Sequence, residues 1–352
     1  MKKSIKNIIP FILFYLTSFI TVLSQNYYKY SLEANASYGR LLAHRPAISP
    51  LIQNNTFSLE SSIYFNSDGN KTHHYYYNYL STGITINFTN SGNFSQIGNI
   101  YSLYGFLCIP LNKNKNPISL KMGLGIGWVE KIFDLGLNYQ NTAIGSHLNS
   151  NIQFKIEKKL NIKTRHCIRY GIGFSHLSNA SIQSPNLGLN FLSGQLSYQF
   201  GLKNNDIDST TKEYIIRRKI FFSLYNSSAF KENSVSSLRK YYINENTVQI
   251  RYRKNIKLSF ITGFDLLFNS SLENLETKIQ SGYYLGNIIH FNKLVLGFQF
   301  GTYLYNKIES KDIFFQKIFT EYKPFNNFLI RLSLKSHLGK ADFVSIGFGY
   351  EF

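Results

Sequence analysis

Apolar residues alternate with polar residues or glycine in run after run of this chain, and this period of two is the feature that most restricts its fold. One run, residues 118–128, has an apolar face formed by Ile118, Leu120, Met122, Leu124, Ile126 and Trp128. A period of two is that of a β-strand, whose successive side chains point to opposite faces. Strands of about ten residues, apolar on one face and polar or glycine on the other, are typical of β-barrels in the bacterial outer membrane. Closure of such a barrel satisfies every backbone hydrogen bond within the lipid.

The last run and the number of runs agree with this interpretation. The last run has one apolar face that ends in a terminal phenylalanine, formed by Val344, Ile346, Phe348, Tyr350 and Phe352. Counting the runs gives about eight strands before Gly201 and roughly six to eight after Glu213. We therefore expect an all-β fold, a transmembrane antiparallel barrel of about 16 strands, with 14 possible. One barrel is favoured over two, because a second small barrel would need its own closure.

The polar segments between the runs predict the connections. With the N-terminus in the periplasm, we expect short periplasmic turns at residues 111–116, 159–163 and 291–293. Longer outer loops are expected at residues 42–55, 130–144, 177–188 and 227–242. The polar residues 202–211 are compatible with a linker. The expected division is thus a first part of the barrel at residues 25–201 and additional C-terminal barrel strands at residues 202–352.

The N-terminus predicts export. Lys2, Lys3 and Lys6 precede an apolar run at residues 8–23, which is followed by small and polar residues. This pattern is that of a cleaved secretory signal peptide, expected at residues 1–24. The formal charge of +19 comes from basic residues scattered through alternating segments. That scatter favours an anionic membrane surface over nucleic acid as the partner.

A candidate site lies in the stretch HLSNASIQSPNLGLN, residues 176–190. His176 and Ser178 are two residues apart, so an extended strand presents them on one face with their Cα atoms roughly 6.5–7 Å apart. An imidazole can then reach a hydroxyl, which is the minimum geometry of a base-activated serine nucleophile. With eight histidines in the chain, this spacing alone is a weak signal.

The alternation also predicts the direction in which the candidate residues point. His176 continues the apolar face formed by Ile168, Tyr170, Ile172 and Phe174, and Asn190 is in phase with Leu192 and Leu196. His176, Ser178 and Asn190 are therefore expected on the lipid-facing side at the extracellular rim. Polar residues on that surface are expensive and usually functional. At headgroup depth polar side chains have little free-energy cost, so a functional site and a merely tolerated polar rim both remain open at this point.

The same stretch resembles the signature of the outer-membrane lipid A 3-O-deacylases, the PagL-type acyloxyacyl hydrolases. The resemblance covers roughly residues 26–201, with support from residues 38–46 (YGRLLAHRP) and 141–149 (NTAIGSHLN). It implies an eight-stranded barrel with an outward-facing site that cleaves an ester-linked acyl chain from lipid A. Residues 213–352 have no counterpart in the small enzymes of this family.

The resemblance implies a role for each matching residue. His176 matches the general base, Ser178 the nucleophile and Asn179 a structural asparagine of the motif. Asn186, with a backbone N–H near Ser181, matches the position that stabilises the oxyanion.

Asn190 departs from the family pattern, since the small enzymes have a glutamate there that orients the histidine. An amide can still fix the imidazole, but it supplies no negative charge. A slow esterase, an enzyme with another acid such as Asp134 or Glu130, and a protein without activity all remain possible on the sequence.

The sequence as a whole predicts an outer-membrane esterase that removes an acyl chain from lipid A, or from a related lipid, of the outer leaflet. No cofactor and no metal are expected, because the neighbouring His73 and His74 have no evident third ligand. The alternative is a barrel without catalysis, a channel or a surface-binding protein with a degenerate site. The sequence does not specify an oligomeric state.

Overall fold

The computed structural model describes residues 27–205, 215–216, 218–232, 239–272, 277–307, 313–338 and 340–352. The expected signal peptide and residues 206–211 of the polar segment lie outside these ranges. Neither of the two helices in the described residues has the length and hydrophobicity needed to cross a membrane.

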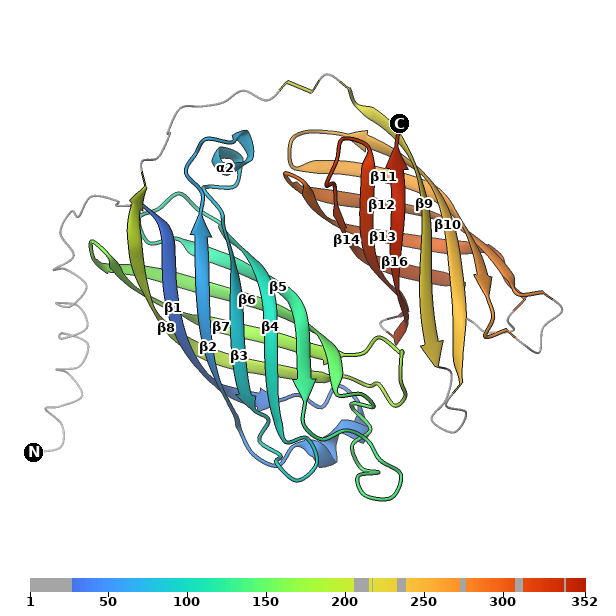
Figure 1. Cartoon of the computed structure of the whole chain (residues 1–352), viewed down its shortest axis with the longest axis horizontal. Helices are drawn as coiled ribbons and strands as arrows, with labels where there is room; N and C mark the ends of the chain where they lie inside the picture. Colours follow the sequence, from blue (N-terminus) through green and yellow to red (C-terminus); the bar gives the residue numbers. More distant parts are fainter. Residues whose placement is uncertain are drawn as a thin grey trace, which may run out of the picture.

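The described residues form sixteen antiparallel strands in two closed barrels of eight strands each (Figure 1). The first barrel consists of β1 (Tyr27–Leu41), β2 (Thr56–Asn66), β3 (Ser81–Asn90), β4 (Asn99–Pro110), β5 (Ile118–Val129), β6 (Leu148–Lys163), β7 (His166–Ser178) and β8 (Leu189–Asn205). The second consists of β9 (Ile220–Glu232), β10 (Lys240–Arg253), β11 (Leu258–Asn269), β12 (Ile279–Phe291), β13 (Leu294–Tyr305), β14 (Phe314–Tyr322), β15 (Phe328–His337) and β16 (Lys340–Glu351). A short 3-10 helix, η1 (Pro46–Leu51), follows β1, and α2 (Thr72–Tyr76) follows β2.

The all-β membrane barrel expected from the sequence is confirmed, but the expectation of a single barrel is wrong. β8 returns to β1 and pairs with it from Tyr27↔Asn205 to Leu41↔Phe191. β16 likewise pairs with β9, for example at Ser345↔Ala229. Each set of eight strands therefore satisfies its own edges. The alternating pattern is identical in one large and two small barrels, so it cannot distinguish between them.

Two of the expected connections are also wrong. Residues 159–163 belong to β6, which continues to Lys163. Residues 227–242 include the end of β9 and the start of β10. Ser227 points inward and is 4% exposed, while Ser228 and Phe230 lie on the outer face, where Phe230 is 54% exposed. Consecutive polar residues such as Ser227 and Ser228 resemble a loop in sequence, which explains the error.

Figure 1 shows the two barrels side by side, with α2 and the C-terminus at one end and η1 at the other. The connections at the η1 end of the first barrel are mostly longer than those at the α2 end. Since long loops face outward and short turns face the periplasm in such barrels, the η1 end is the extracellular end.

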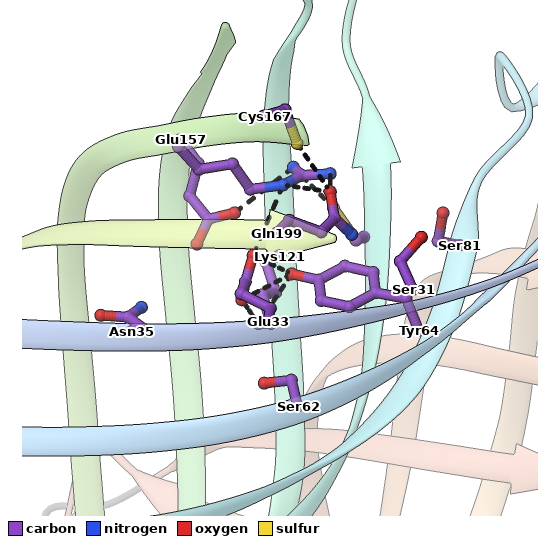
Figure 2. A network of polar contacts seen from close by, with 12 residues as sticks. Ser31, Glu33, Asn35, Ser62, Tyr64, Ser81, Lys121, Glu157, Cys167 and Gln199 are labelled. Carbon is purple, nitrogen blue, oxygen red and sulfur yellow. Dashed lines mark hydrogen bonds and ion pairs between the residues drawn. The ribbon is translucent and has the colours of Figure 1, made fainter. Parts of the chain in front are cut away.

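Paired charges and aromatic rings fill the lumen of the first barrel (Figure 2). Glu33 accepts hydrogen bonds from Lys121 Nζ at 3.1 Å and from the Tyr64 hydroxyl at 2.9 Å. Arg169 Nε lies 3.5 Å from the same carboxylate. Because each buried charge has a partner, the cost of removing it from water is offset.

The second barrel is filled in the same way. Glu321 forms ion pairs with Arg251 at 2.7 Å and with Arg331 at 2.9 Å. Lys317 forms one with Asp265 at 2.7 Å. The interior of an eight-stranded barrel is just wide enough for side chains to fill it, and buried, paired side chains line both lumens among the described residues.

Candidate active site

The pairing of β7 with β8 determines which way the candidate residues point. The register runs without a shift from His166↔Phe200 to Leu177↔Leu189 and brings His176 opposite Asn190. Leu177, 2% exposed, packs in an apolar cluster that closes the extracellular end of the barrel. The neighbours of an inward residue face outward, so His176 and Ser178 lie on the outer wall, the side that the alternation predicted.

His176 joins Ser178 and Asn190 in a hydrogen-bonded row. Its Nε2 lies 2.9 Å from Ser178 Oγ, and its Nδ1 lies 2.5 Å from Asn190 Oδ1. This is the arrangement of a nucleophile, a base and a group that orients the base. The imidazole is partly buried, and Ser178 is 8% exposed.

His44 extends this row, and sequence reasoning missed it. Asn190 Nδ2 lies 2.9 Å from His44 Nδ1, and His44 Nε2 lies 2.9 Å from the carbonyl oxygen of Leu187. His44 was part of the segment 38–46 that supported the family resemblance, but no role was assigned to it. No local sequence pattern could have revealed this contact, because 146 positions separate His44 from Asn190.

The backbone carbonyl at the end of the row determines the direction of every hydrogen bond in it. A carbonyl only accepts, so Nε2 of neutral His44 carries the proton and its Nδ1 accepts from the Asn190 amide. The amide oxygen of Asn190 then accepts from Nδ1–H of His176. The remaining nitrogen of His176, Nε2, is left as an acceptor for the Ser178 hydroxyl, which is the tautomer a general base requires.

Asn179 and Asn186 organise the loop that follows Ser178. The backbone N–H of Asn179 donates to Asn186 Oδ1 at 3.0 Å, which holds the Asn186 amide beside the nucleophile's peptide. Nδ2 of Asn186 is buried and has no hydrogen-bond partner within the described residues. The Asn179 side chain donates to Ser146 Oγ and to the Gln183 carbonyl, both at 2.8 Å. A buried donor without a partner is costly unless a ligand supplies the acceptor.

Ser181 occupies an unusual backbone conformation and reaches the second barrel. Ala180 and Ser181 have φ angles of +52° and +68°, a region that residues other than glycine seldom adopt. The Ser181 hydroxyl donates to the carbonyl of Ala341 in β16 at 3.2 Å. Within the described part of the chain, no hydrogen bond uses the backbone N–H of Ala180 or Ser181.

Gly188 allows the His176 ring to approach the backbone. Its φ is +82°, and a Cβ at this position would lie 2.7 Å from His176 Cε1. Its N–H donates to Ala143 in the β5–β6 loop at 2.9 Å. The β5–β6 loop, which contains the segment 141–149, thus supports the β7–β8 loop from one side.

The two acids considered as substitutes for the missing glutamate have other partners. Asp134 accepts the backbone N–H groups of Gly136 and Leu137 at 2.9 and 2.8 Å. Glu130 accepts the N–H of Asn99 at 2.7 Å, and this hydrogen bond holds the pKa of Glu130 below its usual value. Within the described residues, the orienting partner of His176 is Asn190.

His73 and His74 lie in α2, at the opposite end of the barrel from this row. No group of three or more His, Cys, Asp or Glu side chains gathers as metal ligands within the part of the chain that the structure describes.

Comparisons with known proteins add a family to this geometry. Residues 57–199 match the family model "Lipid A 3-O-deacylase (PagL)" and residues 219–352 match "Acyloxyacyl hydrolase, C-terminal domain". No curated protein matches the chain. Among solved structures, the KdgM porin is 7% identical with a TM-score of 0.21, covering 92% of this chain and 99% of that one. The outer membrane protein Omp33 of Acinetobacter baumannii is 8% identical with a TM-score of 0.18, covering 94% and 99%.

Proposed function

Since the chain belongs to the PagL family of lipid A 3-O-deacylases, we propose that it hydrolyses an ester-linked acyl chain of lipid A with Ser178 as nucleophile and His176 as base. The protein resides in the outer membrane, where lipid A forms the outer leaflet. The observation that carries the proposal is the row from Ser178 through His176 to Asn190, which lies on the lipid-facing wall.

The reaction follows from the direction of the hydrogen bonds. Ser178 Oγ attacks the ester carbonyl carbon while its proton passes to His176 Nε2. The tetrahedral intermediate collapses, the bond to the sugar oxygen breaks, and His176 returns the proton to that oxygen. Water then attacks the acyl-serine with His176 again as base, which releases the fatty acid and regenerates Ser178.

Asn186 is the proposed donor to the oxyanion. Its Nδ2 is buried and has no hydrogen-bond partner among the residues that the structure describes, and its Oδ1 accepts the N–H of Asn179, the residue after the nucleophile. The backbone N–H groups of Ala180 and Ser181, which take part in no hydrogen bond within the described part of the chain, are the other candidates. Donors that find their acceptor only when charge develops stabilise the transition state more than the ground state.

His44 explains how an asparagine can stand where the family has a glutamate. In the serine protease template, an asparagine in place of the acid lowers turnover by about 10⁴, because its N–H₂ group stabilises the wrong tautomer of the histidine. Here His44 accepts from that N–H₂ group, so the carbonyl oxygen of Asn190 faces His176. The correct tautomer is kept without a negative charge, which favours an active enzyme over a degenerate site.

The packed lumen supports chemistry on the outer wall. The inward side chains near the site, such as Gln195 at 8% exposure, are buried and hydrogen-bonded, while Leu192 and Leu196 on the outer wall are exposed. The acyl chain of a lipid can remain in the bilayer while its ester reaches Ser178. A filled lumen also argues against the alternative of a channel.

Mass spectrometry of lipid A tests the proposal. Cells that express the protein should contain lipid A lacking one ester-linked acyl chain, and cells that express Ser178→Ala should contain the full set. An unchanged lipid A profile with the wild-type protein folded in the outer membrane would contradict the proposed activity. Lipid A that lacks the acyl chain in cells expressing Ser178→Ala would contradict the proposed nucleophile.

A further inference from the structure

The loop that carries the catalytic motif is hydrogen-bonded to the second barrel. The backbone N–H of Glu232, at the end of β9, donates to the Ser181 carbonyl at 2.9 Å. The carboxylate of Glu232 accepts the backbone N–H of Ser184 at 2.5 Å. The Ser181 hydroxyl donates to Ala341 in β16. The extracellular ends of β9 and β16 thus hold residues 181–184 at three points, where Figure 1 shows the two barrels meeting.

These contacts fall on the part of the loop that most needs support. Ala180 and Ser181 are consecutive non-glycine residues with positive φ, a backbone conformation that is strained for L-amino acids with a side chain. A strained segment persists only when its surroundings hold it in place. Asn179 holds one side of the loop from within the first barrel, and Glu232 holds the other side from the second barrel.

A second contact joins the two barrels at the periplasmic end. Tyr77, just after α2, packs its ring 4.8 Å from that of Phe291 at the β12–β13 turn. Leu80 joins the same buried cluster. The barrels are therefore in contact at both ends, and at the extracellular end the rim of β9 and β16 lies against the loop.

We propose that the second barrel positions the catalytic loop, and that Glu232 is the positioning residue through which it acts. The inference rests on the proposed function, because the loop matters to catalysis only if Ser178 is the nucleophile. Residues 180–186 carry the proposed oxyanion donors, and these donors act in the transition state. Loss of the support should therefore lower kcat and leave KM nearly unchanged.

The glutamate can be tested by truncation and by a conservative replacement. Glu232→Ala removes the acceptor for the Ser184 N–H, whereas Glu232→Gln keeps a carbonyl oxygen at that place. Lys231→Ala is a matched control at the same strand end. It breaks an ion pair with Asp342 at 2.7 Å, but among the described residues the Lys231 side chain donates no hydrogen bond to the loop. Ser181→Ala is a second variant, because it removes the bond to Ala341 from the loop side.

The measurement is release of fatty acid from purified lipid A by full-length protein in detergent, with kcat and KM determined separately. We expect Glu232→Ala to lower kcat by about 10- to 100-fold, the scale of a shift of up to 1 Å in a catalytic group. Glu232→Gln should stay within about threefold of the wild type, and Lys231→Ala should be unaffected. Heat-modifiable gel mobility monitors folding of each variant.

The outcomes separate this inference from the proposed function. If Ser178→Ala is inactive while folded Glu232→Ala and Ser181→Ala keep the wild-type kcat, the second barrel does not position the loop. The same holds if Glu232→Gln is as impaired as Glu232→Ala, because the acceptor would then not be the cause. If Ser178→Ala remains active, the proposed nucleophile is wrong, and if the folded wild type releases no fatty acid, the proposed function fails instead.

Discussion

Replacing Gly188 by alanine tests whether the His176 ring must remain in its present position. A Cβ at residue 188 would lie 2.7 Å from His176 Cε1, whereas ordinary contacts begin at 3.4 Å. The ring must therefore move by roughly 0.7 Å, the difference of the two distances. Since a misplacement of about 1 Å can cost about 10²-fold, we expect kcat to fall by roughly 30- to 100-fold. The φ of +82° adds a loss of roughly 1–2 kcal/mol in folding stability.

Two further variants separate displacement of the ring from backbone strain. Gly188→Asn introduces the same Cβ, but asparagine tolerates positive φ, so stability should recover while kcat stays low. Gly194→Ala in β8 is the control, because a Cβ there meets nothing within 4 Å. The assay is fatty acid release from lipid A, with heat-modifiable gel mobility as the measure of folding. A folded Gly188→Ala protein with the wild-type kcat would refute the argument.

Four other changes have expected outcomes. His44→Ala should lower kcat by at least tenfold. Asn190→Glu in the His44→Ala background should restore kcat, because a carboxylate has no N–H to favour the wrong tautomer of His176. If steady-state kinetics show no such rescue, the hydrogen-bonded row does not set the tautomer. Asn186→Asp keeps the acceptor for Asn179 but removes the donor, so kcat should fall by about 10²–10³-fold with KM unchanged. Lys121→Ala removes one of the two cations beside the buried Glu33 carboxylate and should destabilise the first barrel by about 3–5 kcal/mol, measured by denaturant titration in detergent. Burial and the nearby His74 and Lys71 lower the pKa of His73 to about 4 from 6.5. The free energy of unfolding should therefore be highest above pH 6.5 and fall as the pH drops towards 4. His73→Asn should flatten this pH dependence in melting curves.

Local alternation predicted much of the outer wall. Ile172, Leu192 and Leu196 were expected to face lipid, and each is exposed in the structure. His176 and Asn190 could be placed on the same side because the pairing of β7 with β8 has no bulge along its length. Their roles in catalysis remain predictions.

The alternation alone could not predict that the barrel closes after eight strands, and the missed residue follows from the same error. In a single barrel of sixteen strands, β1 would not pair with β8, and His44 would lie far from Asn190. Closure after eight strands brings the ends of β1 and β8 together, as at Leu41↔Phe191. His44 is thus found only when the long-range pairing is known. The contact of Glu232 with the loop depends on a second barrel and was beyond reach for the same reason.

The filled lumens have a consequence for the cell that makes this protein. Glu33, Lys121 and Tyr64 block one lumen, and Arg251, Glu321 and Arg331 block the other. Sixteen strands arranged as one open ring would admit nutrients, toxins and antibiotics through every copy. Arranged as two eight-stranded barrels with side chains in their lumens, the same length of chain leaves the permeability barrier of the membrane intact. A cell can therefore increase the number of copies, and so the rate at which its surface lipid is remodelled, without becoming leaky.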